Sequence, residues 1–205
     1  MTPRTITTPS LLRWPAVAAA AIMTVALSGC SSPDINEDYT DVEVLAEFES
    51  RIADSVEQAD GFAGFATRER ELTGCFYGED HNDQGEDEDH STATTRYTLR
   101  DEFTDGSAVQ DIAAAFERHW TELGWEVDAW RDEQTGEYNS VTGTSEDGIS
   151  LLYQAGSIVS LDAFHSGCVA IDEDPIEASE PIGDVPVGED RFQNLSNRAN
   201  PDDEV

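Results

Sequence analysis

Residues 107–124, SAVQDIAAAFERHWTELG, decide the fold of this chain because they hold its clearest helix signal. Apolar side chains recur there at intervals of three and four, as on a helix with one buried face. They are Val109, Ile112, Phe116, Trp120 and Leu123. Ser107 and Gln110 have the spacing of a capping box, and Gly124 is a residue type that ends helices in the left-handed conformation. The sequence therefore predicts a helix from Ser107 to Gly124.

A second amphipathic helix is predicted upstream of this one. Thr40 and Glu43 have the spacing of another capping box, and Gly61 marks the end of the periodic stretch. The expected buried stripe comprises Leu45, Phe48, Ile52 and Val56. Residues 62–72 follow as either a short extension of this helix or a loop.

Short strands account for most of the remaining pattern. Alternation of apolar and polar residues between Gly-containing turns predicts strands at 94–103, 125–129, 138–143, 149–154 and 158–164. This order of elements predicts an α+β fold, a two-layer sandwich in which two helices cover one face of an antiparallel sheet of about four or five strands. We place this domain at residues 40–171. Residues 172–205 are acidic and rich in Pro, which predicts a disordered tail.

The N-terminal segment has the three parts of a secretory signal. Arg4 and Arg13 are its only charged side chains, residues 16–27 are almost wholly apolar, and Ser28 and Gly29 are small. The apolar run is about a dozen residues, against the ~20 that a membrane-spanning helix needs. We therefore expect residues 1–29 to be a signal peptide and not a membrane span.

The run closes on Leu27-Ser28-Gly29-Cys30, which resembles the lipobox of bacterial lipoproteins. The resemblance implies cleavage before Cys30, a diacylglyceryl group on its thiol and acylation, with palmitate for example, of its amino group. Residues 30–39 would then tether the domain to the cell membrane, facing outside the cytoplasm; two or more acyl chains hold stably where one does not. An ordinary secretory signal, with Cys30 merely nearby, is the alternative.

The layout as a whole resembles small lipoproteins of unknown function found in actinobacteria. The resemblance rests on the lipobox, the helix that runs into Gly124-Trp125, the short hairpins and the late Ser166-Gly167-Cys168, and it covers most of residues 40–168. No activity attaches to these motifs, so the resemblance implies none.

The strongly negative charge of the chain limits the kinds of molecule that it can bind. The chain has 44 acidic residues and 11 basic ones, all of them Arg, for a formal charge of −33; loss of Arg4 and Arg13 with the signal brings it to −35. Such a surface repels phosphate backbones, because nucleic-acid binding requires cationic side chains that displace counterions. Nucleic acid is therefore excluded as a partner. We expect the protein to contact the membrane through its lipid anchor and to bind an envelope protein or a small ligand.

Two cysteines remain after lipidation, Cys75 and Cys168. In an exported protein an even pair predicts a disulfide. A metal site or a redox pair is the alternative, but a metal would require further Cys or His residues at ligand spacing. We expect the disulfide and no cofactor.

Residues 79–90 are nearly all acidic and polar, which predicts a solvated loop. Within it, Asp80, Asn82 and Gln84 occupy the first three ligand positions of a calcium loop. The twelfth position is Ser91, where a bidentate carboxylate is expected, so we predict no specific metal site and treat the three as weak candidates. His81 and His90 are nine residues apart, which matches no compact ligand pattern and favours surface positions.

His165 and Ser166, with Asp162 nearby, have the residue types of a hydrolase triad, but adjacent residues on a strand point to opposite faces. His119 lies off the stripe of its helix, which predicts exposure. Among the tryptophans, Trp120 belongs to the core stripe, whereas Trp130 falls on the strand face opposite Trp125 and is a candidate binding surface if exposed. We therefore expect a non-enzymatic binding module, with a cation-responsive acidic protein as the alternative and a hydrolase as the least favoured.

Overall fold

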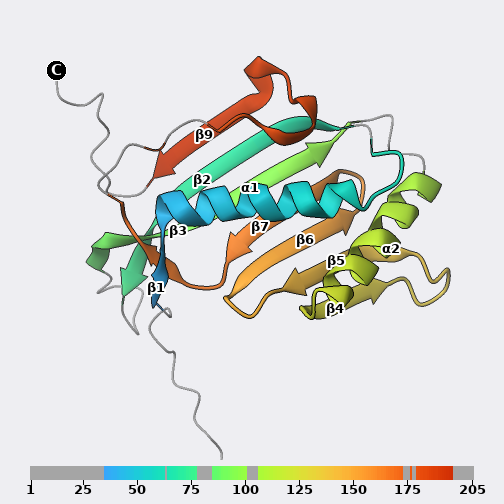
Figure 1. The fold of residues 1–205 in the computed structure, drawn as a ribbon, viewed down its shortest axis with the longest axis horizontal. Coiled ribbons are helices and arrows are strands. Elements are labelled where there is room, and N and C mark those ends of the chain that lie inside the picture. The colour runs from blue at the N-terminus through green and yellow to red at the C-terminus, as the bar shows by residue number, and fades with distance from the viewer. Residues whose placement is uncertain are drawn as a thin grey trace, which may run out of the picture.

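The computed structural model describes residues 35–62, 64–77, 85–100, 106–172, 176 and 179–195. In these residues nine strands form one sheet, and two helices of 17 residues each lie against it (Figure 1). The helices are α1 (Asp41–Glu57) and α2 (Gly106–Glu122). The strands are β1 (Ile35–Thr40), β2 (Phe65–Tyr77), β3 (Gly85–Leu99), β4 (Glu126–Arg131), β5 (Tyr138–Thr144), β6 (Ile149–Ala155), β7 (Val159–His165), β8 (Cys168–Ala170) and β9 (Asp190–Leu195).

β3 connects the parts of the sheet, because it pairs with β2 in a long hairpin and also with β7 and β8. β9 pairs in parallel with the outer edge of β2. Two strands pair with the other edge of β3, one after the other along its length. β8 pairs with residues 90–91 of β3, and β7 pairs with residues 94–98. From β7 the sheet continues through β6 and β5 to the edge strand β4, while β8 pairs in parallel with β1. The result is a curled, mixed half-barrel.

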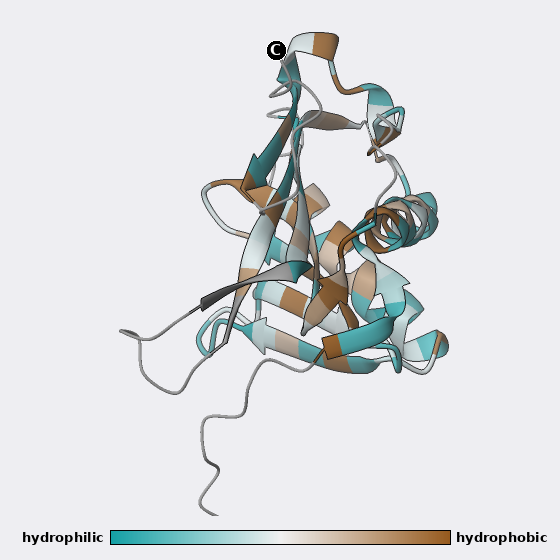
Figure 2. Ribbon diagram, turned by 90° about the vertical axis from the view of Figure 1, so that its left-hand side faces the viewer, coloured by the Kyte–Doolittle hydropathy of each residue, from teal (hydrophilic) through white to brown (hydrophobic). Residues whose placement is uncertain are grey.

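The core lies between the helices and the concave side of this sheet. Seen from the side, α1 is apolar toward the strands and polar away from them (Figure 2). Val44, Phe48 and Ile52 of α1 are fully buried there. Trp120 of α2 is also fully buried, and it lies so close to β5 that a Cβ on Gly143 would come within 2.6 Å of its ring. Only glycine fits at that point, so this contact fixes α2 against its own hairpin.

Both predicted helices are confirmed, with small shifts at their ends. The Thr40 hydroxyl accepts from the Glu43 N–H, and the Glu43 carboxylate accepts from the Thr40 N–H. α1 ends at Glu57, before Gly61. α2 ends at Glu122, and Gly124 follows with a φ of +78°, in the left-handed region where glycine is favoured.

The prediction of a two-layer sandwich with four or five strands is wrong, because the described residues form nine strands in a half-barrel. Most of β2 and the first part of β3 are not predicted from the sequence because these segments are rich in polar and charged residues. Residues 65–72, predicted as a loop or helix extension, belong to β2, and β3 begins at Gly85, within the predicted acidic loop. β2 places Arg68 and Arg70 at buried positions, so its inward face does not read as apolar.

Two boundaries also move outward. Residues 35–39 of the predicted tether form β1 together with Thr40. The predicted disordered tail does not hold for residues 190–195, which form β9, and Ile182 N–H donates to the buried Tyr97 hydroxyl at 3.1 Å. Backbone pairing with β2 stabilises β9 without an apolar sequence of its own.

The predicted disulfide between Cys75 and Cys168 is confirmed. The two residues are 93 apart in the chain, and their Cα atoms are 6.3 Å apart. The bond joins the end of β2 to the start of β8, and both cysteines are buried. A loop of this length is worth about 4–5 kcal/mol in the chain-entropy model.

Candidate functional site

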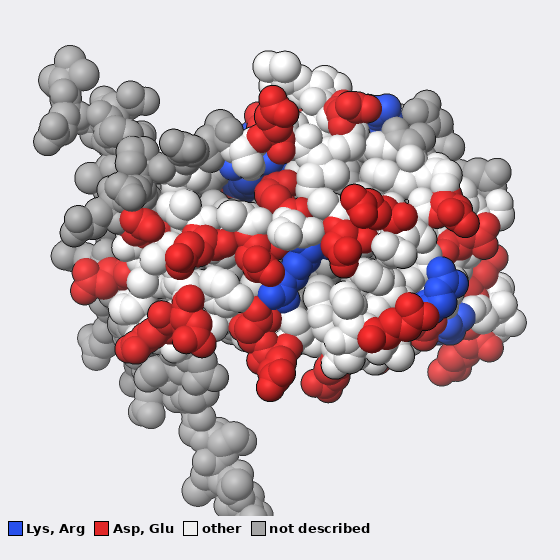
Figure 3. Space-filling model, viewed as in Figure 1, with Lys and Arg blue, Asp and Glu red and all other residues white. Residues whose placement is uncertain are grey.

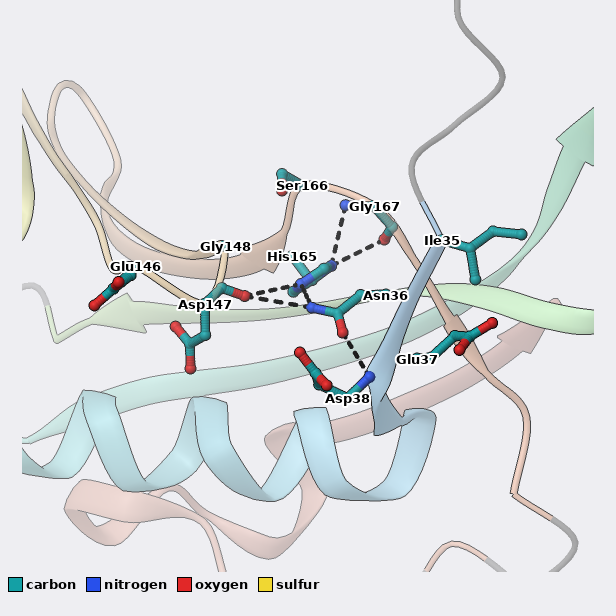
Figure 4. Close-up of a pocket in the computed structure, with 10 residues that line it drawn as sticks. All are labelled: Ile35, Asn36, Glu37, Asp38, Glu146, Asp147, Gly148, His165, Ser166 and Gly167. Atoms are coloured by element: carbon teal, nitrogen blue, oxygen red, sulfur yellow. Dashed lines mark hydrogen bonds between the residues drawn. The ribbon is translucent and has the colours of Figure 1, made fainter.

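The candidate site is a shallow cleft of about 530 Å³ where β1 meets the turn between β5 and β6 (Figure 4). Three segments far apart in the sequence line it: residues 35–38, 146–148 and 165–167. Parallel pairing of Ile35 with Cys168 brings the first segment beside the third. The sheet therefore assembles the cleft from its first strand and its later hairpins.

His165 forms the floor of the cleft, and both of its ring nitrogens are engaged. Gly167 N–H donates to Nδ1 at 3.0 Å. On the other side of the ring, Nε2 lies 3.0 Å from Asn36 Nδ2 and 3.3 Å from the Asp147 carbonyl oxygen. The side chains converge in the close-up view, and His165 as a whole residue is only 8% exposed. His165 thus holds β1 and the turn together.

Gly148 makes this close approach sterically feasible. Its φ is +85°, and a Cβ there would lie 3.2 Å from His165 Nε2 and 3.1 Å from Ser166 Oγ. Any other residue would strain the turn and push against the imidazole. The turn is therefore shaped to fit over His165.

Asp147 is the most strongly bonded carboxylate of the site. It accepts hydrogen bonds from the Tyr39 hydroxyl at 2.6 Å, from Ser145 Oγ, and from Arg51 Nη1 and Nη2 at 3.1 and 2.6 Å. Burial opposes ionisation, but the hydrogen bonds from Arg51, Ser145 and Tyr39 outweigh it and hold the pKa of Asp147 well below its usual range. The hydrogen bond to Asp147, together with burial, raises the pKa of Tyr39 to about 12.

A second hollow, of about 590 Å³, adjoins the cleft on the other side of the same turn. Its wall is Trp125, whose ring stacks on Trp120 with centroids 6.1 Å apart. The Arg51 guanidinium lies over Trp125, 5.4 Å from the ring centroid. Arg51 thus connects the aromatic core to the turn that forms the cleft.

The rim of the cleft is acidic. Glu37, Asp38 and Glu146 are exposed, and their carboxylates have no hydrogen bond or ion pair with any residue that the structure describes. Asp147 is neutralised by Arg51, so it does not add to this excess. The helix side of the molecule as a whole carries many more acidic than basic side chains (Figure 3). The cleft therefore favours cationic or hydrogen-bond-donating groups.

The residue types of a hydrolase triad are not brought together. Asp162 lies on the opposite face of β7 from His165 and pairs with Arg96, whose Nε donates to it at 2.8 Å. Ser166 adjoins the cleft, but the His165 nitrogens are occupied by Gly167, Asn36 and Asp147. In the described residues, His165 is therefore not hydrogen-bonded to the Ser166 hydroxyl as the base of a triad would be.

Other predicted positions have mixed outcomes. The prediction that His119 is exposed is wrong, because its side chain is 13% exposed and Nε2 lies 2.8 Å from Asp54 Oδ2. Trp120 is in the core, and its indole N–H donates to Ser55 Oγ at 3.0 Å. Trp130 is 65% exposed on the edge strand β4, with its backbone paired to Ser140. His90 lies on β3 and is half-buried.

The remaining predicted sites lie outside the described residues. They are Cys30, Asp80, His81, Asn82 and Gln84. Among the residues that are described, no group of three or more His, Cys, Asp and Glu side chains could hold a metal ion. No helix in the described part of the chain has the length and apolar character needed to cross a bilayer.

No protein-family model, curated protein or solved structure matches this chain. The site must therefore be interpreted from its own geometry. Sequence reasoning missed Asn36, Tyr39, Arg51 and Asp147, which form the frame of the cleft. Arg51 and Asp147 are 96 residues apart, and nothing in the local pattern of either indicates the other. The only local signal was Glu146-Asp147-Gly148, which predicts a turn.

Proposed function

We propose that this chain is a lipid-anchored protein of the outer face of the cell membrane, and that its domain is a non-enzymatic module that binds a cationic ligand at the β1 cleft. The observation that carries the proposal is the set of three exposed carboxylates, Glu37, Asp38 and Glu146, on a frame held rigid by His165 and Asp147. A frame that is already held by hydrogen bonds suits recognition, because the backbone that carries these carboxylates does not have to be ordered on binding.

The position of β1 supports the anchored part of the proposal. Ile35 follows Cys30 by five residues, and an extended chain spans at most about 3.6 Å per residue. A lipid on Cys30 would hold Ile35 within about 18 Å of its attachment point. The cleft would then lie close to the membrane, where a basic segment of an envelope protein or a small amine could reach it.

Anchoring is tested by substituting Cys30→Ala and fractionating cells. We expect the variant protein in the medium or the soluble fraction, because the acyl chains have no attachment point. Equal retention in the membrane fraction would contradict the lipoprotein proposal.

Binding at the cleft is tested on the full-length protein in detergent, with a tetra-arginine peptide as the probe in a calorimetric titration. Glu37→Gln with Glu146→Gln removes two rim charges, and we expect at least a tenfold weaker affinity. Glu133→Gln with Glu137→Gln is the matched control, because both residues are exposed and lie in the turn between β4 and β5, at the other end of β5 from the turn that lines the cleft. Equal loss in both double variants would mean that the peptide binds the acidic surface in general.

The alternative, a calcium-responsive surface protein, depends on Asp80, Asn82 and Gln84. Thermal melting in calcium chloride and sodium chloride at matched ionic strength separates the two functions. Equal midpoints indicate screening of the acidic surface alone. Stabilisation at much lower calcium concentration would favour a specific cation site, and loss of that effect on deletion of residues 80–84 would locate it.

A further inference from the structure

Two buried arginines lie on the side of α1 opposite the cleft. Arg68 and Arg70 occupy alternate positions of β2 and therefore point to the same face, toward α1 and the core. We call Arg68, Arg70, Glu49 and Asp190 the arginine cluster. In the space-filling view, basic atoms over β2 and β9 lie recessed between acidic ones (Figure 3).

Arg68 is completely satisfied. Its side chain is fully buried, and Nε and Nη2 donate to the two oxygens of Asp190 at 2.7 and 2.6 Å. Nη1 donates to Glu49 Oε1 and Ser179 Oγ, both at 3.0 Å, and Nη2 also donates to the Ser179 carbonyl at 2.7 Å. All five N–H groups of this guanidinium therefore have acceptors.

Arg70, two residues away, is in the opposite situation. It is only 6% exposed, yet its guanidinium makes no hydrogen bond to any residue in the described part of the chain. Nε is shielded from solvent without a partner. The nearest carboxylate oxygen, Asp190 Oδ2, is 3.9 Å from Nη2 and already accepts from Arg68. Burial, and then the charge of Arg68, lower the pKa of Arg70.

A second unpartnered donor stands next to this guanidinium. Thr95 on β3 is the direct cross-strand partner of Arg70, so their Cβ atoms are about 4.5–5.5 Å apart on the same face. Thr95 is fully buried, and its Oγ1 has no hydrogen-bond partner among the residues that the structure describes. The Phe192 ring of β9, 39% exposed, lies 5.3 Å from Arg70 Cζ. The cluster is thus close to the surface under an aromatic ring.

The contact with Phe192 does not satisfy the guanidinium. A ring face attracts the positive charge, but it offers no oxygen to the five N–H groups. A buried donor without an acceptor is destabilising by roughly 1–3 kcal/mol, and more if it is charged. The Arg70 guanidinium can only donate, and the Thr95 hydroxyl can donate as well as accept, so a negatively charged group with several acceptor atoms would satisfy both.

We propose that Arg70 and Thr95 form a binding site for a small oxyanion, such as a carboxylate, sulfate or phosphate group. The arginine cluster is formally neutral, with two arginines and two carboxylates, so local donors and not net charge provide the attraction. This site lies on the other side of α1 from the acidic cleft, and it would select ligands of the opposite charge. The inference does not depend on the function proposed for the cleft.

The test is thermal melting of the full-length protein in detergent, in sodium sulfate, phosphate and acetate titrated against sodium chloride at matched ionic strength. Sulfate and phosphate stabilise most proteins by exclusion from the surface, an effect that does not saturate. We expect an additional, saturating rise of the midpoint at low millimolar concentration of at least one oxyanion. Arg70→Met should abolish the saturating rise while melting at or above the wild-type midpoint in chloride.

Arg191→Gln is the matched control, because its side chain is 58% exposed on β9 and lies outside the cluster. It should keep the saturating rise. Thr95→Val should weaken the apparent affinity several-fold, and it serves as the test if Arg70→Met fails to fold. A wild-type response equal in all four salts, or an unchanged saturating response in the Arg70 or Thr95 variant, would overturn the proposal.

Discussion

The two sides of α1 place arginine in opposite settings. On the cleft side, Arg51 is 14% exposed and donates to Glu47, Ser145 and Asp147. On the side opposite the cleft, Arg70 of β2 is more deeply buried and donates to none of the residues described. The chain has 44 acidic residues, yet in its described part the buried guanidinium of Arg70 has no hydrogen-bond acceptor.

Arg51 and Arg70 differ in hydrogen bonding because they differ in how many carboxylates lie within reach of the guanidinium. Arg51 projects from a helix toward a turn that carries Asp147, and Glu47 lies one helical turn away on the same face. In the arginine cluster, two carboxylates face two arginines, and Asp190 binds Arg68 with both of its oxygens. Net charge therefore says little about the local supply of acceptors in the interior.

The largest effect is expected from Arg68→Met compared with Arg70→Met. Loss of Arg68 removes its five hydrogen bonds and leaves the half-buried carboxylates of Glu49 and Asp190 without this partner, which should lower the free energy of unfolding by about 3 kcal/mol. Arg70→Met should change it by less than about 0.5 kcal/mol or increase it, because no hydrogen bond is lost. Urea unfolding in chloride buffer measures both, and equal losses would show that the two arginines are equivalent.

Arg51→Met probes the other side of the helix. It removes the hydrogen bonds to Asp147 and the contact with Trp125, and we expect a loss of about 2 kcal/mol, reduced by the partial exposure of the pair. A double-mutant cycle with Asp147→Asn isolates the interaction between the two residues. A coupling energy near zero would indicate that the loss comes from packing on Trp125 alone.

Acid should weaken the cleft side through Asp147. Its pKa is lower in the folded chain than the ordinary value of about 3.9, so the ionised form stabilises the fold above that value. The free energy of unfolding should fall as pH drops from about 5 toward the folded pKa. Asp147→Asn should be less stable at pH 7 and show a shallower decline in acid. Urea unfolding between pH 3 and 7 gives both curves, and parallel curves would mean that other carboxylates cause the decline.

The smallest effect on stability is expected at Trp130, which lies on neither of the two sides of α1 compared above. With 65% of the residue exposed, Trp130→Ala should change the free energy of unfolding by less than about 0.5 kcal/mol. Urea unfolding measures the change. A loss above 1 kcal/mol would mean that the ring packs on the sheet more closely than its exposure indicates.

The sequence predicts the α2 half of the fold well, because its signals are local. The stripe of residues 107–124 and the Gly124 stop identify α2, and short Gly-containing turns separate β4 to β7. β2 escapes prediction because Arg68 and Arg70 replace apolar residues on its inward face, so both faces read as polar. β9 escapes because its order comes from backbone pairing with β2, far away in the chain.

The candidate site was less predictable than the fold. His165 was identified by residue type, but its role depends on Asn36, which is 129 residues away. The unpartnered state of Arg70 depends on how Asp190 divides its two oxygens. Such features are set by long-range geometry, and a single sequence carries no local pattern for them.

The pairing of β1 with β8 also defines how a pulling force would enter the domain. If the chain is held through Cys30, tension reaches Ile35 first, and Ile35 is paired with Cys168. The covalent bond from Cys168 to Cys75 passes that load directly to β2, which pairs with β3 and β9. β1 could peel away while the rest of the sheet stayed intact, and peeling would separate Asn36 from His165 and open the cleft. Tension on the anchor and binding at the cleft would then be coupled, because both depend on the contact between Asn36 and His165.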